Sequence, residues 1–109
     1  MKFRIIIQPP AFDDLDETYV YLAKRYSPES AGAWHSGCID AMQALVDQPQ
    51  RHALARESAK LGVEIRQMLY RRHRSVYRIL FTIEQSAVRV LCIRHAARDE
   101  LTAEDVSTD

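Results

Sequence analysis

Arginine side chains are concentrated in one part of this 109-residue sequence. Residues 65–98 contain eight Arg, no Lys and a single acidic residue, Glu84. A guanidinium group matches the planar geometry of phosphate or carboxylate. His95 lies in the same stretch, and imidazole is a common acid–base group near neutral pH. This pattern predicts a surface for an anionic partner, which would be nucleic acid, a phosphate-rich complex or an acidic protein segment. The alternative is a solvated sheet edge whose charges block aggregation.

The rest of the chain balances this positive charge, so that the formal net charge is zero. Residues 1–50 carry a net charge of −3 and residues 65–98 carry +7, whereas residues 99–109 contain five acidic residues and no basic one. The two cysteines, Cys38 and Cys92, are expected to be buried thiols, because no cluster of Cys and His has the spacing of metal ligands. We expect neither a metal site nor a cofactor.

Length and composition predict a single soluble domain over residues 1–109, ending in the acidic tail 99–109. A hydrophobic fraction of 47% and a charged fraction of 28% are ordinary for a globular protein. No stretch approaches the ~18 apolar residues of a membrane span. The apolar run near Met1 is too short for a signal peptide. We therefore expect a cytoplasmic protein with no membrane segment.

A β-hairpin is predicted within residues 76–98, because two runs rich in Val, Ile, Leu, Phe and Tyr flank Gln85 and Ser86. Alternation along the strands then gives a mixed face and an apolar face. A two-residue turn predicts five pairs on the mixed face: Glu84 with Ala87, Thr82 with Arg89, Leu80 with Leu91, Arg78 with Ile93, and Val76 with His95. The other face carries Arg94 at the strand end and the apolar residues Tyr77, Ile79, Phe81, Ile83, Val88, Val90 and Cys92.

Two amphipathic helices are predicted before this hairpin. Apolar residues recur at three- and four-residue steps after Pro10, and Ser27-Pro28-Glu29 is typical of a helix start. The predicted elements are, in order, strand 3–8, helix 10–25, helix 28–47, a helical turn at 53–58, and strands 63–71, 76–84 and 87–95. This β-α-α-β-β-β order predicts an α+β fold of two layers, in which a helical hairpin covers the apolar face of an antiparallel sheet. The face that carries Arg78, Arg89 and His95 would then be open to its partner.

The ordered set of motifs resembles the RelE/ParE superfamily of toxins from bacterial type II toxin–antitoxin pairs. The resemblance covers nearly the whole chain. Its motifs are Pro9 and Ala11 after the first strand, DLDE at 14–17, YLA at 21–23, QP at 48–49, YRILF at 77–81, VRVL at 88–91 and IRHAARD at 93–99. The resemblance implies a small cytoplasmic toxin that a cognate antitoxin neutralises by wrapping a segment around its surface.

Two branches of the superfamily differ in chemistry. RelE-like members cleave mRNA on the ribosome, and such cleavage needs a base, an acid and cations at the phosphate. The resemblance to that branch implies phosphate binding by Arg78 and Arg98 and acid–base catalysis by His95, with Glu57 or Glu64 as a candidate base. ParE-like members instead poison DNA gyrase by protein contact and are not nucleases.

The ParE-like branch fits this sequence better. RelE-like enzymes often carry a Lys cluster before the second strand and a Tyr beyond the fourth, whereas here only Lys60 occupies that loop and no aromatic residue follows Arg98. A third alternative is a nontoxic relative that binds an anion or a protein. The residues expected to contact an anionic partner or the antitoxin are Arg66, Arg78, Arg89, Arg94 and Arg98. The oligomeric state and any enzymatic activity stay open.

Overall fold

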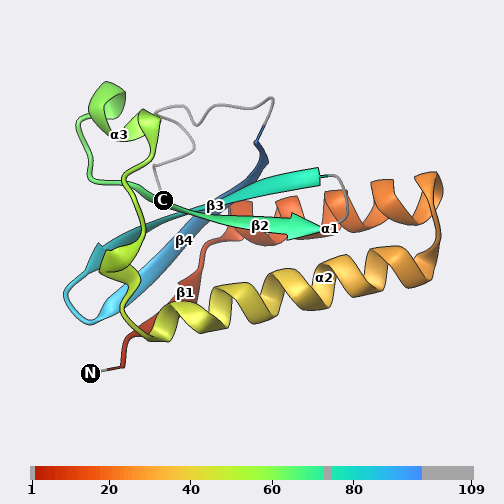
Figure 1. The fold of residues 1–109 in the computed structure, drawn as a ribbon, viewed down its shortest axis with the longest axis horizontal. Helices are drawn as coiled ribbons and strands as arrows, with labels where there is room; N and C mark the ends of the chain where they lie inside the picture. The colour runs from red at the N-terminus through yellow and green to blue at the C-terminus, as the bar shows by residue number, and fades with distance from the viewer. Residues whose placement is uncertain (1, 73–74, 97–109) are drawn as a thin grey trace.

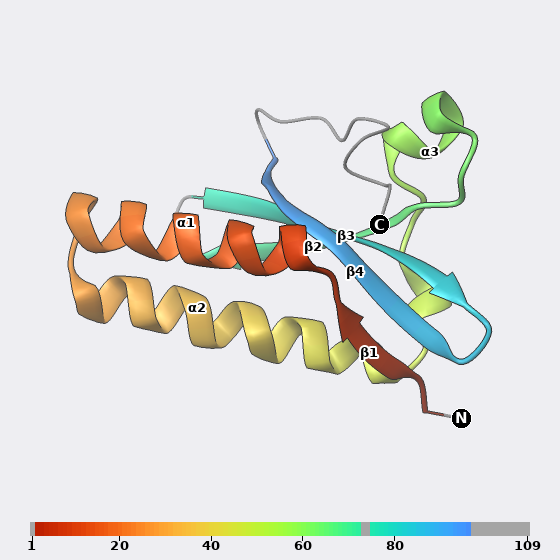
Figure 2. The ribbon, with the colours of Figure 1, turned by 180° about the vertical axis from the view of Figure 1, so that it is seen from behind.

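The computed structural model describes residues 2–72 and 75–96. Its elements are β1 (Arg4–Ile7), α1 (Pro9–Arg25), α2 (Pro28–Gln43), the short 3₁₀ turns η1 (Ala44–Val46) and η2 (Pro49–Arg51), α3 (Arg56–Leu61), β2 (Arg66–Arg72), β3 (Ser75–Glu84) and β4 (Ala87–His95). The sheet has the strand order β1-β4-β3-β2. The helices α1 and α2 form a hairpin beside it (Figures 1 and 2). The predicted α+β fold is confirmed.

The sheet is mixed, although an antiparallel one was expected. β4 pairs antiparallel with β3, and β3 pairs antiparallel with β2. β1 lies parallel to β4, with Arg4 opposite Ala87 and Ile7 opposite Val90. Parallel strands need a long crossover between them, and here all the intervening elements, from α1 to β3, provide it.

Local sequence signals account for both long helices. Proline occupies the first positions of α1 and α2, where its missing N–H costs no hydrogen bond. The Ser27 side chain caps α2 by accepting a hydrogen bond of 3.0 Å from the Ser30 N–H. The predicted starts are thus confirmed to within one residue. The α-helical part of α2 ends at Gln43, earlier than expected, because the chain tightens into η1.

The two helices cover one face of the sheet and bury the main core there. We call this cluster the helix-side core. Trp34, Cys38 and Met42 of α2 are 0–1% exposed. The other fully enclosed members are Ala11, Leu15, Leu45, Ile79, Phe81, Val88 and Val90, with Tyr77 and Ile93 at up to 7% exposure. Burial of this apolar surface is the principal favourable term for the fold.

A hydrogen bond between β2 and α2 depends on a glycine. The Tyr70 hydroxyl donates a hydrogen bond of 3.0 Å to the Trp34 carbonyl oxygen. A Cβ atom added at Gly37 would overlap that same hydroxyl, whereas one at Gly32 would meet nothing within 4 Å. Gly37 therefore lets the Tyr70 side chain reach the helix backbone.

The β3–β4 hairpin has the predicted two-residue turn, but its register shifts partway along. Next to the turn, the pairing is as predicted: Glu84 lies opposite Ala87, and Thr82 lies opposite Arg89. Phe81 then pairs with Val90 and Leu80 with Cys92, so Leu91 is the extra residue of a β-bulge. The predicted partners of Leu80, Arg78 and Val76 are wrong for this reason.

The bulge changes which face the end of β4 presents, because side chains alternate along a strand. Cys92 was expected against the helices but packs with Leu80 and Leu91 on the opposite face. Ile93 takes its place in the helix-side core. His95 was expected beside Arg78, but it pairs with Tyr77 instead, and Arg78 pairs with Arg94.

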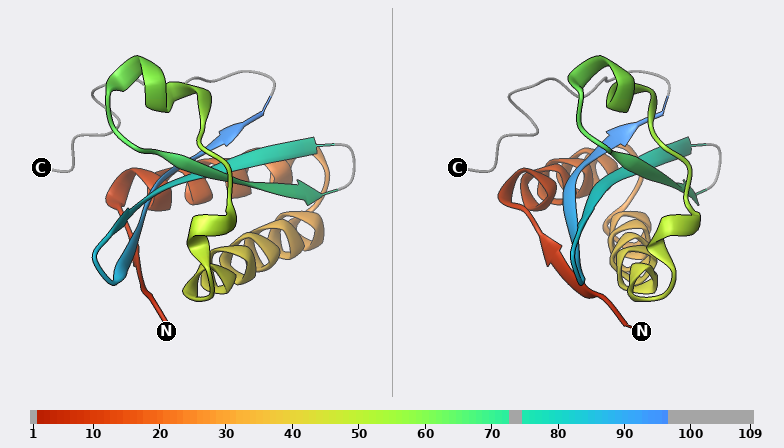
Figure 3. Two further views of the ribbon diagram at one scale, coloured as in Figure 1. Left: turned by 60° about the vertical axis from the view of Figure 1, so that its left-hand side comes forward. Right: turned by 90° about the vertical axis from the view of Figure 1, so that its left-hand side faces the viewer.

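The opposite face of the sheet was expected to be open, but another segment of the chain covers it. Residues 53–65, which we call the α3 segment, lie across it from the helical hairpin (Figure 3). Ala55, Leu61 and Ile65 of this segment form a second cluster, the far-side cluster, with Leu80, Leu91 and Cys92. The apolar residues of this segment, which follow no regular helical or strand spacing, thus cover the second face of the sheet.

No helix in the described part of the chain is long and apolar enough to cross a membrane.

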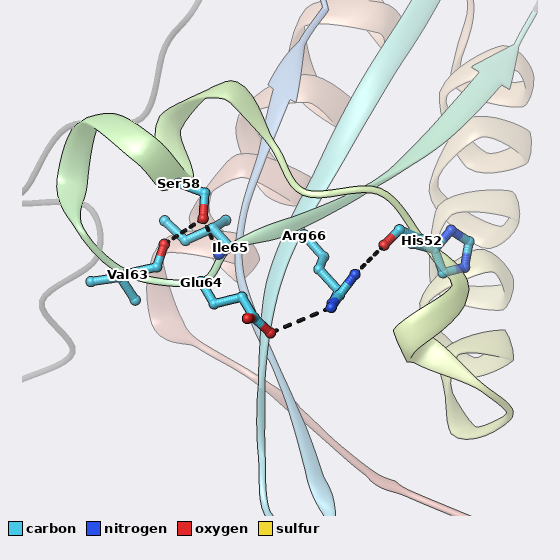
Figure 4. Close-up of polar contacts among 6 residues, drawn as sticks. All are labelled: His52, Ser58, Val63, Glu64, Ile65 and Arg66. Atoms are coloured by element: carbon cyan, nitrogen blue, oxygen red, sulfur yellow. Dashed lines mark hydrogen bonds and ion pairs between the residues drawn. The ribbon is translucent and has the colours of Figure 1, made fainter.

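Polar contacts hold the ends of the α3 segment together (Figure 4). The Ser58 hydroxyl donates to the Val63 carbonyl oxygen at 2.7 Å and accepts from the Ile65 N–H at 3.1 Å. Gly62 ends α3 with a φ of 70°, a left-handed conformation that glycine adopts readily. The Ala55 N–H donates to the Ile65 carbonyl oxygen at 2.7 Å, which closes the loop.

Candidate functional site

Arg78 is enclosed beneath the α3 segment. Its side chain is 3% exposed, and that of Glu57, its partner on α3, is 0% exposed. Arg78 Nη1 lies 2.8 Å from Glu57 Oε1, and Arg78 Nη2 binds the other carboxylate oxygen. Nη1 also lies 3.1 Å from Gln67 Oε1. The expectation that Arg78 is exposed to a partner is therefore wrong, because a buried guanidinium requires this compensation.

His95 and Arg94 lie at the end of β4, next to α1. The His95 ring packs edge-on against Tyr77, with 5.4 Å between the ring centroids. Arg94 Nη1 lies 2.7 Å from Asp14 Oδ2, and the same oxygen accepts the Ile93 N–H at 2.8 Å. Asp14, on α1, thus binds β4 beyond the end of β1.

Arg89 and Arg66 lie apart from these residues. Arg89 Nη2 is 3.2 Å from Glu84 Oε1 near the hairpin turn. Arg66 Nη1 donates to the His52 carbonyl oxygen at 2.7 Å, and its Nη2 is 3.4 Å from Glu64 (Figure 4). Arg98 lies outside the described residues. The five arginines singled out in the sequence are therefore not seen to converge on one site in the described ranges.

A groove lies between the helical hairpin and the ends of β3 and β4. Two cavities of about 450 and 620 Å³ adjoin there and share Leu22, Tyr26, Ser75 and Tyr77. The first extends to Ser30, Trp34 and Arg72. The second extends to Asp14, Glu17, Thr18, Tyr21, Ile93, Arg94 and His95. We call this surface the hairpin groove.

The hairpin groove was not predicted from the sequence, and it becomes apparent from the exposure of its aromatic residues. Tyr21 and Tyr26 are 59% and 64% exposed, so they are not needed to fill the core. Aromatic residues exposed beside a cavity are typical of surfaces that bind another protein. Arg94 and His95 do reach this groove, and they are the predicted site residues that the structure brings together.

The groove is lined by apolar, aromatic and charged side chains. Within residues 2–72 and 75–96, no group of three His, Cys, Asp or Glu side chains could hold a metal ion. Three groups with displaced pKa values lie outside the groove. Burial raises the pKa of Cys38 to about 12 and raises the pKa of Tyr70. Burial, and secondarily Arg51 and Arg66, lowers the pKa of His52.

Comparison with known families decides the affiliation of the chain. A family model described as "ParE toxin of type II toxin-antitoxin system, parDE" matches residues 5–100. The chain belongs to the ParE toxin family. The resemblance to the RelE/ParE superfamily is confirmed, on the ParE side.

The fold of this ParE-family toxin is also found among solved structures. A chain described as "Chromosomal ParDE TA system from P. aeruginosa" superposes on it with a TM-score of 0.69 and 18% sequence identity. The superposition covers 86% of this chain and 96% of that one. At this identity the similarity shows a shared fold. A search of curated proteins finds no significant match.

Proposed function

We propose that this ParE-family toxin acts in the cytoplasm by binding DNA gyrase, and that a cognate antitoxin neutralises it. The observation that carries the choice of target is the separation of Arg78 from His95. Arg78 faces the α3 segment, where it binds Glu57, whereas His95 packs on Tyr77 at the hairpin groove. These two side chains are on opposite faces of the sheet.

A ribonuclease site of the RelE-like kind has the opposite requirement. Its cations and its acid–base groups must surround a single phosphate. Here the Arg78 guanidinium is occupied by Glu57 and Gln67, and no phosphate can approach it without displacement of α3. The geometry therefore supports action by protein contact.

The hairpin groove supports the proposal of an antitoxin partner. It offers the apolar side chains of Leu22 and Tyr77 between charged ends at Arg72 and Arg94. An amphipathic antitoxin segment would bury apolar residues between the helices and the sheet while its charged residues remain at the rim. Such burial would also cover the exposed ring of Tyr26.

The target is tested with purified toxin and DNA gyrase. We expect inhibition of supercoiling or accumulation of cleaved DNA, relieved when the cognate antitoxin is added in equal amount. Ribosome-bound mRNA should remain intact in a primer-extension assay with the same preparation. New mRNA cuts that disappear in His95→Ala would instead establish the nuclease alternative, and normal growth upon expression without antitoxin would rule out both toxins.

The groove is tested separately, by antitoxin binding. Tyr26→Asp places a charge at the shared wall of the two cavities, and we expect a Kd about tenfold or more weaker. Phe12→Asp is the matched control, because Phe12 is 49% exposed and lines neither cavity. Equal affinities of the two variants, measured by calorimetry, would remove the groove from the antitoxin interface without affecting the gyrase proposal.

A further inference from the structure

The outer edge of β2 is covered over only part of its length. β2 is the last strand of the sheet, so one side of its backbone has no strand beside it within residues 2–72 and 75–96. At its start, Leu54 bridges to Arg66, and the Gln67 N–H donates to the Ala53 carbonyl oxygen at 3.0 Å. The α3 segment therefore protects the first two residues of this edge.

The remaining part of the edge presents backbone groups that alternate in direction. In an antiparallel ladder, every second residue directs its N–H and C=O away from the paired strand. Because the Gln67 N–H points outward to Ala53, the backbone groups of Leu69 and Arg71 also point outward. No described residue makes a backbone hydrogen bond with either of them on that side. Leu69 is 46% exposed, and Arg71 is exposed as well.

The charge on β2 restricts what could pair with this edge. The strand RQMLYRR contains three arginines and no acidic residue. Pairing with a second copy would bring two Arg71 and two Arg72 side chains into one short ladder, and like charges on neighbouring strands are destabilising. An acidic strand would instead place carboxylates beside these guanidinium groups. The edge thus disfavours a second copy and favours an acidic partner.

We propose that the open edge of β2 binds an extended acidic segment of a protein partner, which adds to the sheet as a fifth strand. Main-chain hydrogen bonds to Leu69 and Arg71 provide the affinity, as in other cases of strand addition. Side chains provide the specificity, with an apolar residue opposite Leu69 and acidic residues opposite Arg71 and Arg72. In an antiparallel strand the two acidic residues therefore come before the apolar one. This edge meets the hairpin groove only at Arg72, and the proposal does not depend on the target of the toxin.

The experiment uses the full chain and the synthetic peptide Ac-Thr-Glu-Glu-Val-Val-Thr-amide. We expect the peptide to slow hydrogen exchange of the Leu69 and Arg71 amides at least tenfold, with the amides of the hairpin groove unchanged. A peptide with Lys in place of both Glu residues should give no protection. Equal protection by both peptides, or protection by neither, would overturn the proposal.

Two variants separate backbone pairing from side-chain contact. Leu69→Pro removes the outward N–H but no hydrogen bond to β3, and proline is tolerated at such edge positions. Leu69→Ala removes the side chain and keeps the N–H. We expect the proline variant, with unchanged circular dichroism, to bind the Glu peptide at least tenfold more weakly than the alanine variant. Equal binding would refute strand addition, and so would loss of binding in the alanine variant alone.

The peptide itself gives a test that needs no variant. N-methylation of the amides that face β2 should abolish protection, whereas N-methylation of the intervening amides should preserve it. Slow exchange of Leu69 and Arg71 without any peptide would also contradict an external partner. If this protection increased with protein concentration, the occupant of the edge would be a second copy of the chain. If the protection did not depend on concentration, the occupant would be residues 97–109 of the same chain.

Discussion

At the scale of single residues, Gly37 and Gly32 provide a matched pair on one helix. Gly37→Ala forces Tyr70 away from the Trp34 carbonyl oxygen, so we expect a loss of about 1–3 kcal/mol in the free energy of unfolding. Gly32→Ala meets no atom within 4 Å and should gain about 0.5–1 kcal/mol, because alanine loses less conformational entropy in a helix. Urea unfolding monitored by Trp34 fluorescence measures both. A similar cost for the two variants would contradict a specific role for Gly37.

The Glu57–Arg78 pair gives a second residue-scale prediction. Glu57→Ala leaves a buried guanidinium without its carboxylate, and we expect destabilisation of about 3–5 kcal/mol. Glu84→Ala removes the exposed partner of Arg89 and should cost less than about 1 kcal/mol. The double variant Glu57→Leu with Arg78→Met should recover much of the stability, since it buries no unpaired charge. Thermal unfolding of the four proteins tests this, and equal costs at Glu57 and Glu84 would refute it.

At the scale of elements, the exposed end of β4 is held by a side chain in place of a strand. Asp14→Ala removes the acceptor of both the Ile93 N–H and Arg94. We expect about 1.5–3 kcal/mol of destabilisation and faster hydrogen exchange at Ile93. Asp14→Asn retains an oxygen for the Ile93 N–H but loses the ion pair, so its exchange rate should stay closer to that of the unmodified protein. Unchanged exchange in Asp14→Ala would show that α1 does not protect this strand through Asp14.

Most elements could be predicted from the sequence because each carries its own local signal. Proline and Ser27 mark the helix starts, and the apolar runs on either side of Gln85 and Ser86 mark the hairpin. The bulge carries no such signal, since Leu91 suits either face of a sheet. The cover over Arg78 was missed for a different reason. Glu57 reaches Arg78 across 21 residues of sequence, and sequence periodicity reports only on neighbours within an element.

The candidate site was predictable in part. Arg94 and His95 were singled out by composition, and they do line the hairpin groove. The groove itself arises where the helical hairpin meets the ends of the strands, and it includes Leu22 from α1 and Tyr26, which follows the last residue of α1. Those residues follow the ordinary apolar spacing of a helix, so their exposure depends on how the layers are arranged.

At the scale of the whole molecule, α2 and β2 each place a side chain that becomes charged in alkali between the two layers. These side chains are Cys38 and Tyr70. Burial raises the pKa of Cys38 from 9.0 to about 12 and also raises the pKa of Tyr70. A raised pKa means that the folded state retains a proton that the unfolded state has lost. Stability from Cys38 is thus fully present below about pH 9 and declines between pH 9 and about 12.

The slope of this decline can be measured against a variant. Cys38 alone should lower the free energy of unfolding by up to about 1.4 kcal/mol per pH unit above pH 9. Cys38→Ala should show a shallower decline over the same range, with Tyr70 still present as an internal control. Urea unfolding at a series of pH values gives both curves. Parallel curves would show that the Cys38 thiol does not contribute.

The single additional residue at Leu91 has a consequence for how relatives of this chain are compared. Because of this residue, His95 lies opposite Tyr77, whereas in a regular ladder that included Leu91 residue 95 would lie opposite Val76, on the side that holds Arg78. A relative without the bulge would therefore keep its histidine on the side of His95 only if it were one residue shorter between the turn and the end of β4. The position of a gap between the turn and the end of β4 in an alignment therefore determines which residues are treated as equivalent to Arg94 and His95.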